Sequence, residues 1–225
     1  MKASCLVRDF ASVFARVARR YRCCGRGTYG YVKGKLRYDP VHQSVLALAE
    51  EEPFGNVLDL GCGRGQLGVA LLEAGLASSV VGIDLQIRHL AQARHAASDL
   101  PYFVVAQDLK LPFAAMQAMT VLLIDVLYQL ADDAQHAVLV AACGAAHERI
   151  VIRTLDPDRG VRSRLTMGAE RLMRRISPHA GALINPWKVA RLQELLTERG
   201  FAVSVAPCWG RTPFANVLLI GRRAK

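Results

Sequence analysis

The chain has 225 residues, of which 52% are hydrophobic and 21% charged, so it suits one compact domain with an appendage and is no disordered chain. No apolar run reaches the about 18 residues that a transmembrane helix needs, and Arg8 and Asp9 interrupt the stretch where a secretory signal would need an apolar core. The six cysteines form no C-x-x-C pair, so we expect no zinc site and a reducing, cytoplasmic location, with peripheral membrane attachment left open.

The net charge of +10 is unevenly distributed along the chain. Residues 1–37 hold ten Lys and Arg against one acidic residue, and residues 159–191 hold eight against one. Residues 38–158 hold six against fifteen, which makes the middle of the chain acidic. The pattern indicates an acidic body that carries two basic segments, each suited to an acidic partner.

The first predicted element is a basic amphipathic helix over residues 6–21. Apolar side chains recur there at helical spacing and cover about 100° of a helical wheel. Arg16, Arg19 and Arg20 fall on the opposite side, where we expect them to attract an anionic partner. Residues 1–50 are therefore predicted to form a basic helical cap in front of the main domain.

From residue 51 to 225, short β-rich runs alternate with helical stretches in units of about 20 to 25 residues. Such alternation predicts right-handed βαβ units, and thus a mostly parallel sheet with helices on both faces. The last two runs have no helix between them, so we expect an antiparallel hairpin at one edge of the sheet. The seven expected strands are VLDL (57–60), SVVGID (79–84), PYFVVAQD (101–108), TVLLIDVLYQL (120–130), RIVIRTL (149–155), FAVSVAP (201–207) and NVLLIGRR (216–223).

Two details complete this expected order. SRLTMGAERLMRRI (163–176) predicts a second basic amphipathic helix, within a helical insertion at about residues 158–184. After it, Asn185 and Pro186 predict the start of a helix, as N-cap and first helical residue, and Gly200 predicts its end.

The stretch VLDLGCGRGQLG (57–68) carries the main functional signal. Gly63, Gly65 and Gly68 match the G-x-G-x-x-G spacing of a dinucleotide-binding turn. Asp59 argues against that ligand, because a carboxylate near the turn repels a pyrophosphate. An amino acid fits better, because its ammonium suits Asp59 and its carboxylate suits the N-terminus of the following helix.

Two more acidic residues follow at strand ends. Asp84 ends the second expected strand and is suited to accept hydrogen bonds from both hydroxyls of a ribose. Asp108 ends the third, where a carboxylate can accept a bond from an adenine amino group. Because these ends meet at one edge of the sheet, an amino acid, a ribose and an adenine lie together, which describes S-adenosylmethionine.

Residues 53–223 resemble the class I S-adenosylmethionine-dependent methyltransferases. Four motifs carry this resemblance, in the order of the family: VLDLGCGRG, VVGIDLQ, VVAQDLKLPF and VLLIDVLYQL. The resemblance implies a methyltransferase with a Rossmann-like, doubly wound α/β fold, a mostly parallel seven-stranded sheet, and S-adenosylmethionine as cofactor. It assigns the methionine part to Asp59, Gly61, Cys62, Gly63 and Gly65, the ribose and one adenine face to Asp84 and Leu85, the adenine edge to Asp108 and Leu109, and the pocket floor to Asp125.

The residues that carry the reaction are less clear from the sequence. Methyl transfer from a sulfonium needs a base only when the acceptor must lose a proton. Tyr128 and His42 are the candidates, with His179 behind them, and we assign no catalytic residue among them. Many family members have His on the fourth strand, where this chain has Tyr128 or Gln129.

The two basic segments stand where this family usually builds its acceptor site. They suit an acyl-carrier-bound acceptor, an anionic membrane surface or, less well, nucleic acid. GYVKGKLRYDPVH (30–42) loosely resembles methyltransferases of bacterial aryl-polyene and fatty-acid-like pathways, which favours a small-molecule, carrier-bound or lipid-like acceptor. The alternatives are an RNA or other nucleic-acid methyltransferase, a non-catalytic S-adenosylmethionine-binding module and a nicotinamide-dependent oxidoreductase; the oligomeric state is unknown.

Overall fold

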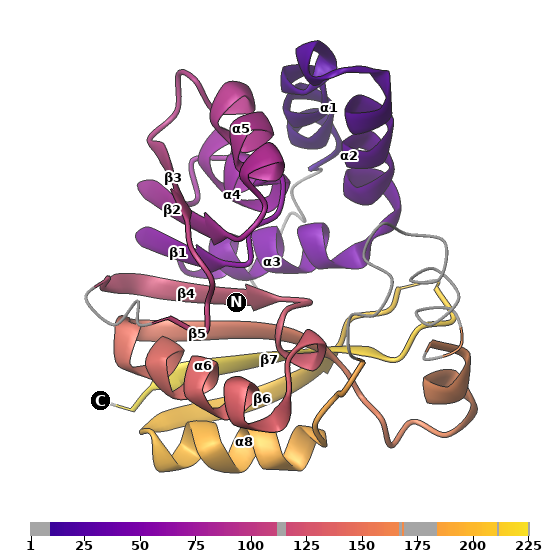
Figure 1. Cartoon of the computed structure of the whole chain (residues 1–225), viewed down its shortest axis with the longest axis vertical. Helices are drawn as coiled ribbons and strands as arrows, with labels where there is room; N and C mark the ends of the chain where they lie inside the picture. Colours follow the sequence, from indigo (N-terminus) through magenta and orange to yellow (C-terminus); the bar gives the residue numbers. More distant parts are fainter. Residues whose placement is uncertain (1–9, 112–115, 167, 169–183, 211, 225) are drawn as a thin grey trace, which may run out of the picture.

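The computed structural model describes residues 10–111, 116–166, 168, 184–210 and 212–224. Its centre is a seven-stranded sheet with the strand order β3-β2-β1-β4-β5-β7-β6 (Figure 1). The strands are β1 (Asn56–Leu60), β2 (Ser79–Asp84), β3 (Tyr102–Ala106), β4 (Ala118–Ile124), β5 (Ala146–Leu155), β6 (Phe201–Pro207) and β7 (Asn216–Arg223). All seven fall on the expected runs, so the fold predicted from the sequence is confirmed.

The direction of the strands also follows the prediction. β1 pairs in parallel with β2 and β4, and the parallel pairing continues outward to β3 and to β5. β7 runs antiparallel between β5 and β6, because no helix carries the chain back to the other end of the sheet. The strand order reverses beside β1, where ligands bind in open sheets of this kind.

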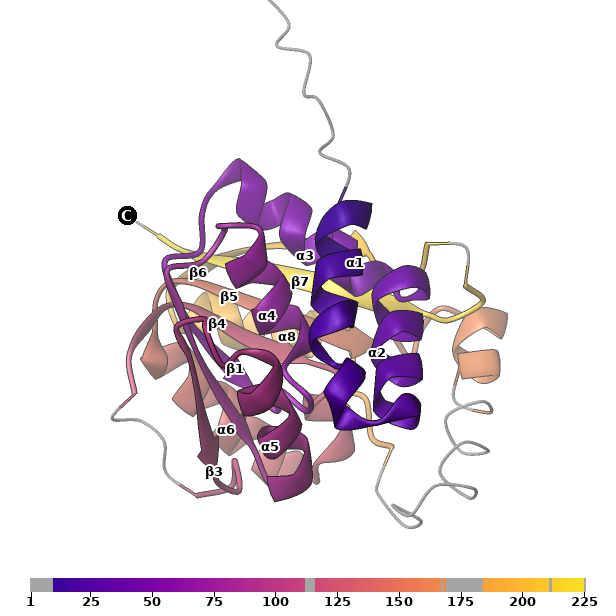
Figure 2. The same ribbon diagram turned by 90° about the horizontal axis from the view of Figure 1, so that it is seen from above.

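Helices cover both faces of the sheet (Figures 1 and 2). α4 (Gln66–Glu73) and α5 (Ile87–Ala96) pack on one face, together with the N-terminal helices, in one apolar cluster. α6 (Asp132–Ala145) and α8 (Val189–Glu198) pack on the other face in a second cluster. The strands between these layers are buried on both sides, which explains their nearly continuous apolar sequences.

The cap consists of α1 (Ala11–Arg20), the short 3-10 helix η1 (Arg22–Cys24), α2 (Arg26–Tyr38) and α3 (Pro40–Glu51). Val17 and Tyr21 are fully buried and belong to the same apolar cluster as α4 and α5. Residues 6–9 of the expected 6–21 helix lie outside the described residues, and a domain boundary at residue 50 stays a prediction. The cap shares one apolar layer with the sheet domain instead of forming a core of its own.

Ion pairs add to this packing between α1 and the body of the protein. Arg16 Nε lies 3.1 Å and Arg20 Nε 2.5 Å from the Glu73 carboxylate on α4. Arg20 also pairs with Asp99, which follows α5. The expectation that Arg16, Arg19 and Arg20 act together on an external anion is therefore revised, because two of the three charges are engaged within the chain.

The start of the last helix differs from the prediction. α8 begins at Val189, and Lys188 stands at its N-cap without a side-chain capping bond. Asn185 Nδ2 instead donates to Asp132 Oδ1 at 2.6 Å, and Trp187 Nε1 donates to the same oxygen at 2.9 Å. These tertiary bonds to the start of α6 override the local capping signal. The predicted end is confirmed, since Gly200 follows the helix with a φ of +83°.

The insertion expected at about residues 158–184 is described only in part. Residues 161–166 are helical, and Ala215 N donates to Thr166 Oγ1 at 2.8 Å, which attaches this helix to the start of β7. Most of the predicted basic helix over residues 163–176 lies outside the described residues. Across the described ranges, no helix combines the length and apolarity that a membrane span requires.

Candidate active site

The carboxyl ends of β1, β2 and β4 and the loop after β3 surround a pocket of about 580 Å³, which the cap helix α2 faces from the opposite side. The structure therefore brings the predicted cofactor residues together at the place that the topology requires. Nine of the ten predicted residues line it, namely Asp59, Gly61, Cys62, Gly63, Asp84, Leu85, Asp108, Leu109 and Asp125.

Gly65 is the predicted residue that does not line the pocket, and its role is to allow close packing. Its φ is +74°, and a Cβ there would lie 2.7 Å from the Tyr102 hydroxyl and 2.8 Å from Ala93 Cβ. Gly63, with a φ of +56°, has open space where a side chain would stand. Gly65 thus lets α4 approach the sheet, and Gly63 leaves the backbone of the turn bare toward the pocket.

Asp59 is the most unusual group in the pocket. It is only 3% exposed, and within the described residues neither a hydrogen bond nor a cation contributes to the pKa of its carboxyl. Burial, together with the nearby charge of Asp84, raises the pKa of Asp59 to about 7. A buried carboxylate without a partner is destabilising by itself, so this position fits a cationic ligand group better than a structural role.

Asp84 has a structural task besides any contact with a ligand. Its Oδ2 accepts a hydrogen bond from Gly63 N at 2.9 Å, and its Oδ1 accepts one from Gln86 N at 2.8 Å. The carboxylate therefore ties the glycine turn to the loop after β2. Each oxygen keeps a second lone pair for a ligand hydroxyl.

The outer part of the pocket is less buried. Asp108 lies two residues beyond β3, and its Oδ1 accepts a hydrogen bond from Lys110 N at 2.9 Å, which folds the loop back. Leu85 is 67% exposed and Leu109 is partly buried, so both offer apolar surface at the pocket mouth. A flat ring lying there would cover surface that is otherwise in water.

A buried charged network at the pocket floor was not predicted from the sequence. Arg153 on β5 places Nη1 2.8 Å from Asp125 Oδ2 and Nη2 3.0 Å from Asp39 Oδ1. Lys35 on α2 lies 3.0 Å from the other Asp39 oxygen. Burial alone would raise the pKa of Asp39, but the two cations lower it to about 2. The network connects the cap helix α2 to the pocket floor across more than 100 residues of sequence.

The cap contributes further side chains that the sequence did not single out. The Arg64 guanidinium stacks 4.3 Å from the centre of the Tyr31 ring, and its Nε donates to Gln92 Oε1 at 2.9 Å. The fully buried Tyr21 donates its hydroxyl to the Arg64 carbonyl oxygen at 2.7 Å. Gln66 also lines the pocket, with a buried Oε1 that has no hydrogen-bond partner. The glycine turn is thus held from the cap side as well as from the sheet.

Two of the three candidate bases line the pocket. His42 is 2% exposed, and burial lowers its pKa to about 4, so its ring is neutral near pH 7. Tyr128, 4% exposed, also lines an adjoining cavity of about 270 Å³. Lys35, Asp39 and Asp125 are shared by both cavities in the same way. His179 lies outside the described residues.

Residues 57–146, which include the glycine turn, Asp84, Asp108 and Asp125, match a family model described as a methyltransferase domain. This region of the chain is therefore similar to a methyltransferase domain. No curated protein sequence matches the chain.

Solved structures share the fold of this chain along nearly its whole length. Magnesium protoporphyrin IX methyltransferase from Synechocystis PCC 6803, with bound SAH, has a TM-score of 0.66 and 21% identity, over 97% of this chain and 99% of that one. The N-methyltransferase NodS from Bradyrhizobium japonicum WM9, also with SAH, has a TM-score of 0.64 and 15% identity, over 95% and 99%. The pyocyanin biosynthetic protein PhzM has a TM-score of 0.61 and 20% identity, over 94% and 62%.

Proposed function

We propose that the 580 Å³ pocket binds S-adenosylmethionine and that the enzyme transfers its methyl group to a small-molecule, carrier-bound or lipid-like acceptor. The unpartnered, buried Asp59 carries the cofactor assignment, because a zwitterionic amino acid supplies the missing cation. The carboxylate of the same amino acid suits the first turn of α4, whose N–H groups lack intrahelical partners. The neighbours solved with S-adenosylhomocysteine support this proposal.

The other pocket residues divide the rest of the cofactor among them. Asp84 is proposed to accept hydrogen bonds from the ribose hydroxyls, while it keeps its bonds to the turn. Leu85 and Leu109 offer apolar surface to the adenine faces, and Asp108 lies beside them for the adenine amino group. When bound, the cofactor supplies an electrophilic methyl group and a neutral leaving group.

The chain itself then has to align the acceptor and exclude water, which lowers the barrier without a metal or an acid. The adjoining 270 Å³ cavity suits the acceptor end, because Asp125 and Tyr128 line both spaces. Its two cations, Lys35 and Arg153, are already paired with Asp39 and Asp125, so the cavity does not select an anion by excess charge. Tyr128 is proposed as the residue nearest the reacting groups. A cytoplasmic location, with its reduced cysteines, is part of the same proposal.

The decisive experiment identifies the acceptor. The protein is incubated with methyl-labelled S-adenosylmethionine and fractionated cell extract, and the labelled product is identified by mass spectrometry. A labelled small molecule, lipid or carrier-bound acyl group supports the proposal, and the Asp59→Ala variant should remove the label. Label in RNA would favour the nucleic-acid alternative, and tight cofactor binding without any transfer would favour a non-catalytic module.

A further inference from the structure

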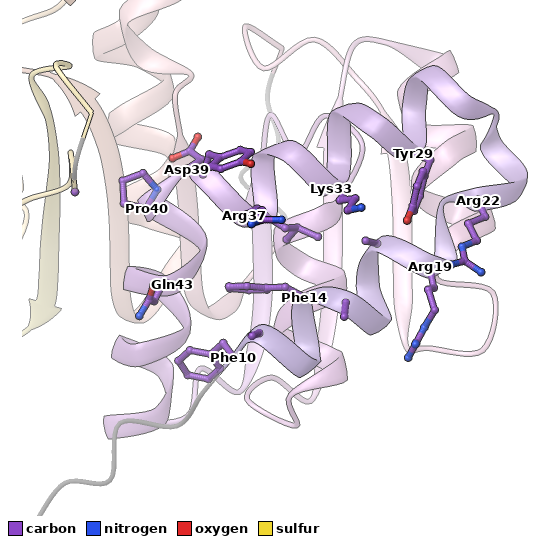
Figure 3. A pocket seen from close by; sticks show the side chains of 16 residues that line it. Phe10, Phe14, Arg19, Arg22, Tyr29, Lys33, Arg37, Asp39, Pro40 and Gln43 are labelled. Carbon is purple, nitrogen blue, oxygen red and sulfur yellow. The ribbon is translucent and has the colours of Figure 1, made fainter.

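A second cavity lies in the cap, outside the site described above. It has a volume of about 1080 Å³ and is bounded by α1, α2 and the start of α3 (Figure 3). α2 separates it from the cofactor pocket, because Tyr31 and Lys35 line that pocket whereas Lys33 and Arg37 line this cavity. Its volume is slightly above the range of about 300–1,000 Å³ that is usual for small-molecule sites.

One end of the cap cavity is apolar. Phe10 and Phe14 lie there, with ring centres 6.3 Å apart, at the start of α1 (Figure 3). Ala18 and Leu36 also line the cavity and are 5% and 3% exposed. Because these side chains are recessed, they suit an apolar group that enters the hollow.

The other end is cationic. Arg19 and Arg22 lie there beside Tyr29, with Lys33 and Arg37 between the two ends (Figure 3). The Arg22 guanidinium carbon lies 5.8 Å from the centre of the Tyr29 ring, and Lys33 Nζ lies 5.9 Å from it. Within the described ranges, none of the four cations pairs with a carboxylate, whereas Arg16 and Arg20 on the same helix both do.

The lining includes one acidic side chain, Asp39, and its carboxylate is engaged by Lys35 and Arg153. The positive charge in the cavity is therefore not neutralised from within. Phe10 and Phe14 stand nine and five positions before Arg19 along α1, so they are about 8–14 Å from it along the helix axis at 1.5 Å per residue. That separation matches a chain of many methylenes better than a compact anion.

We propose that the cap cavity is a binding site for a single hydrocarbon chain that ends in a carboxylate. The chain lies against Phe10 and Phe14, and the carboxylate is bound by Arg19 together with Arg22, Lys33 or Arg37. This site is separate from the proposed cofactor pocket and does not depend on the proposed methyl transfer. A flat membrane surface fits less well, because Phe10 is 3% exposed and does not project from the protein.

The experiment is a calorimetric titration of the full chain with dodecanoate below its critical micelle concentration. We expect saturable binding, no binding of butyrate, which lacks the chain, and none of dodecyltrimethylammonium, which carries the opposite charge. Saturating S-adenosylhomocysteine should leave the dodecanoate affinity unchanged. Displacement of dodecanoate by S-adenosylhomocysteine would place it in the cofactor pocket and overturn the proposal.

Variants test the location. Arg19→Gln with Arg37→Gln should weaken dodecanoate by about fivefold to tenfold, as expected for two exposed charge contacts. Ala15→Trp, at an exposed lining position, should block entry. Arg26→Gln is the matched control, because Arg26 is exposed on α2 outside the lining, and it should change nothing. Equal losses in the control and the double variant, or binding only to phosphatidylglycerol vesicles, would overturn the proposal.

Discussion

Arg153 Nη1 lies 2.8 Å from Asp125 Oδ2, so a side chain of β5 fixes the residue that directly follows the neighbouring strand β4. Asp125 has a φ of +60°, a conformation that non-glycine residues rarely adopt. The same guanidinium also bonds to Asp39, which caps the N-terminus of α3 by accepting a hydrogen bond from Val41 N at 3.2 Å. One buried cation thus holds the pocket floor and the cap in a fixed relation.

We predict that Arg153→Met lowers the free energy of unfolding by about 3 kcal/mol, because breaking a buried pair leaves carboxylates without their cation. Chemical denaturation near pH 7 measures this loss. Adding Asp125→Asn to Arg153→Met should recover part of the lost stability, because it removes a carboxylate that has lost its cation. Arg222→Met is the control, because the Arg222 side chain is 43% exposed. If the effects of Arg153→Met and Asp125→Asn on the free energy of unfolding simply added in the double variant, the two residues would not belong to one network.

A second prediction concerns Asp84. Hydrogen bonds to a charged group are worth about 1.5–3 kcal/mol, so Asp84→Ala should weaken S-adenosylhomocysteine at least about tenfold. Because Asp84 also binds Gly63 N and Gln86 N, part of this loss can come from the loop. Calorimetry with an analogue that lacks the ribose 2′-hydroxyl separates the two causes. The wild type should discriminate against the analogue, and the variant should not.

Asp59 predicts a pH dependence of cofactor binding. Its pKa is about 7 in the free protein, and the ligand ammonium favours the ionised form. Affinity for S-adenosylhomocysteine should therefore fall as the pH drops from 8 to 5, by at most about tenfold per unit. Asp59→Asn should bind more weakly at pH 8 and lose most of this slope. Calorimetry across the range checks it, and an unchanged slope in the variant would show that another group titrates.

The same residue predicts a gain in stability on mutation. The pKa of Asp59 is raised on folding, so the ionised form is destabilising above the unfolded value of about 3.9. Asp59→Asn should make the ligand-free protein more stable at pH 8, by roughly 2–4 kcal/mol, and this gain should shrink as the pH falls toward 4. Thermal unfolding at both pH values measures it. A less stable variant at pH 8 would mean that Asp59 has a structural partner.

These sites differ in how far the sequence could predict them. Asp59, Asp84 and the glycine turn were predictable because each stands at a strand end, and parallel strands bring their carboxyl ends to one edge. The network of Asp39, Arg153 and Asp125 was not predictable, because its members come from the start of a helix, from β5 and from the residue after β4. A single basic or acidic residue beside a strand gives no sign of its partner. Asn185 misled for a related reason, since its side chain bonds to α6 and not to its own helix.

The last prediction concerns how the cap is attached. The sequence of α1 predicted that Arg16, Arg19 and Arg20 together attract an anionic partner. In the structure, Arg16 and Arg20 pair with Glu73 on α4, and Arg19 does not. Arg20 is 22% and Glu73 11% exposed at the side chain, so water screens this pair less than a pair at the open surface. Arg20→Glu places a carboxylate beside those of Glu73 and Asp99 and should loosen α1.

Hydrogen exchange followed by mass spectrometry measures that loosening. In Arg20→Glu, amides of residues 11–20 should exchange about fivefold faster, which corresponds to about 1 kcal/mol of local stability. The charge-swapped double variant, Arg20→Glu with Glu73→Arg, should restore much of the protection. Arg19→Glu is the matched control on the same helix, and it should leave α1 protected, because Arg19 makes no ion pair within the described residues. Equal loosening by both single variants would mean that overall charge, and not the contact with Glu73, holds the cap in place.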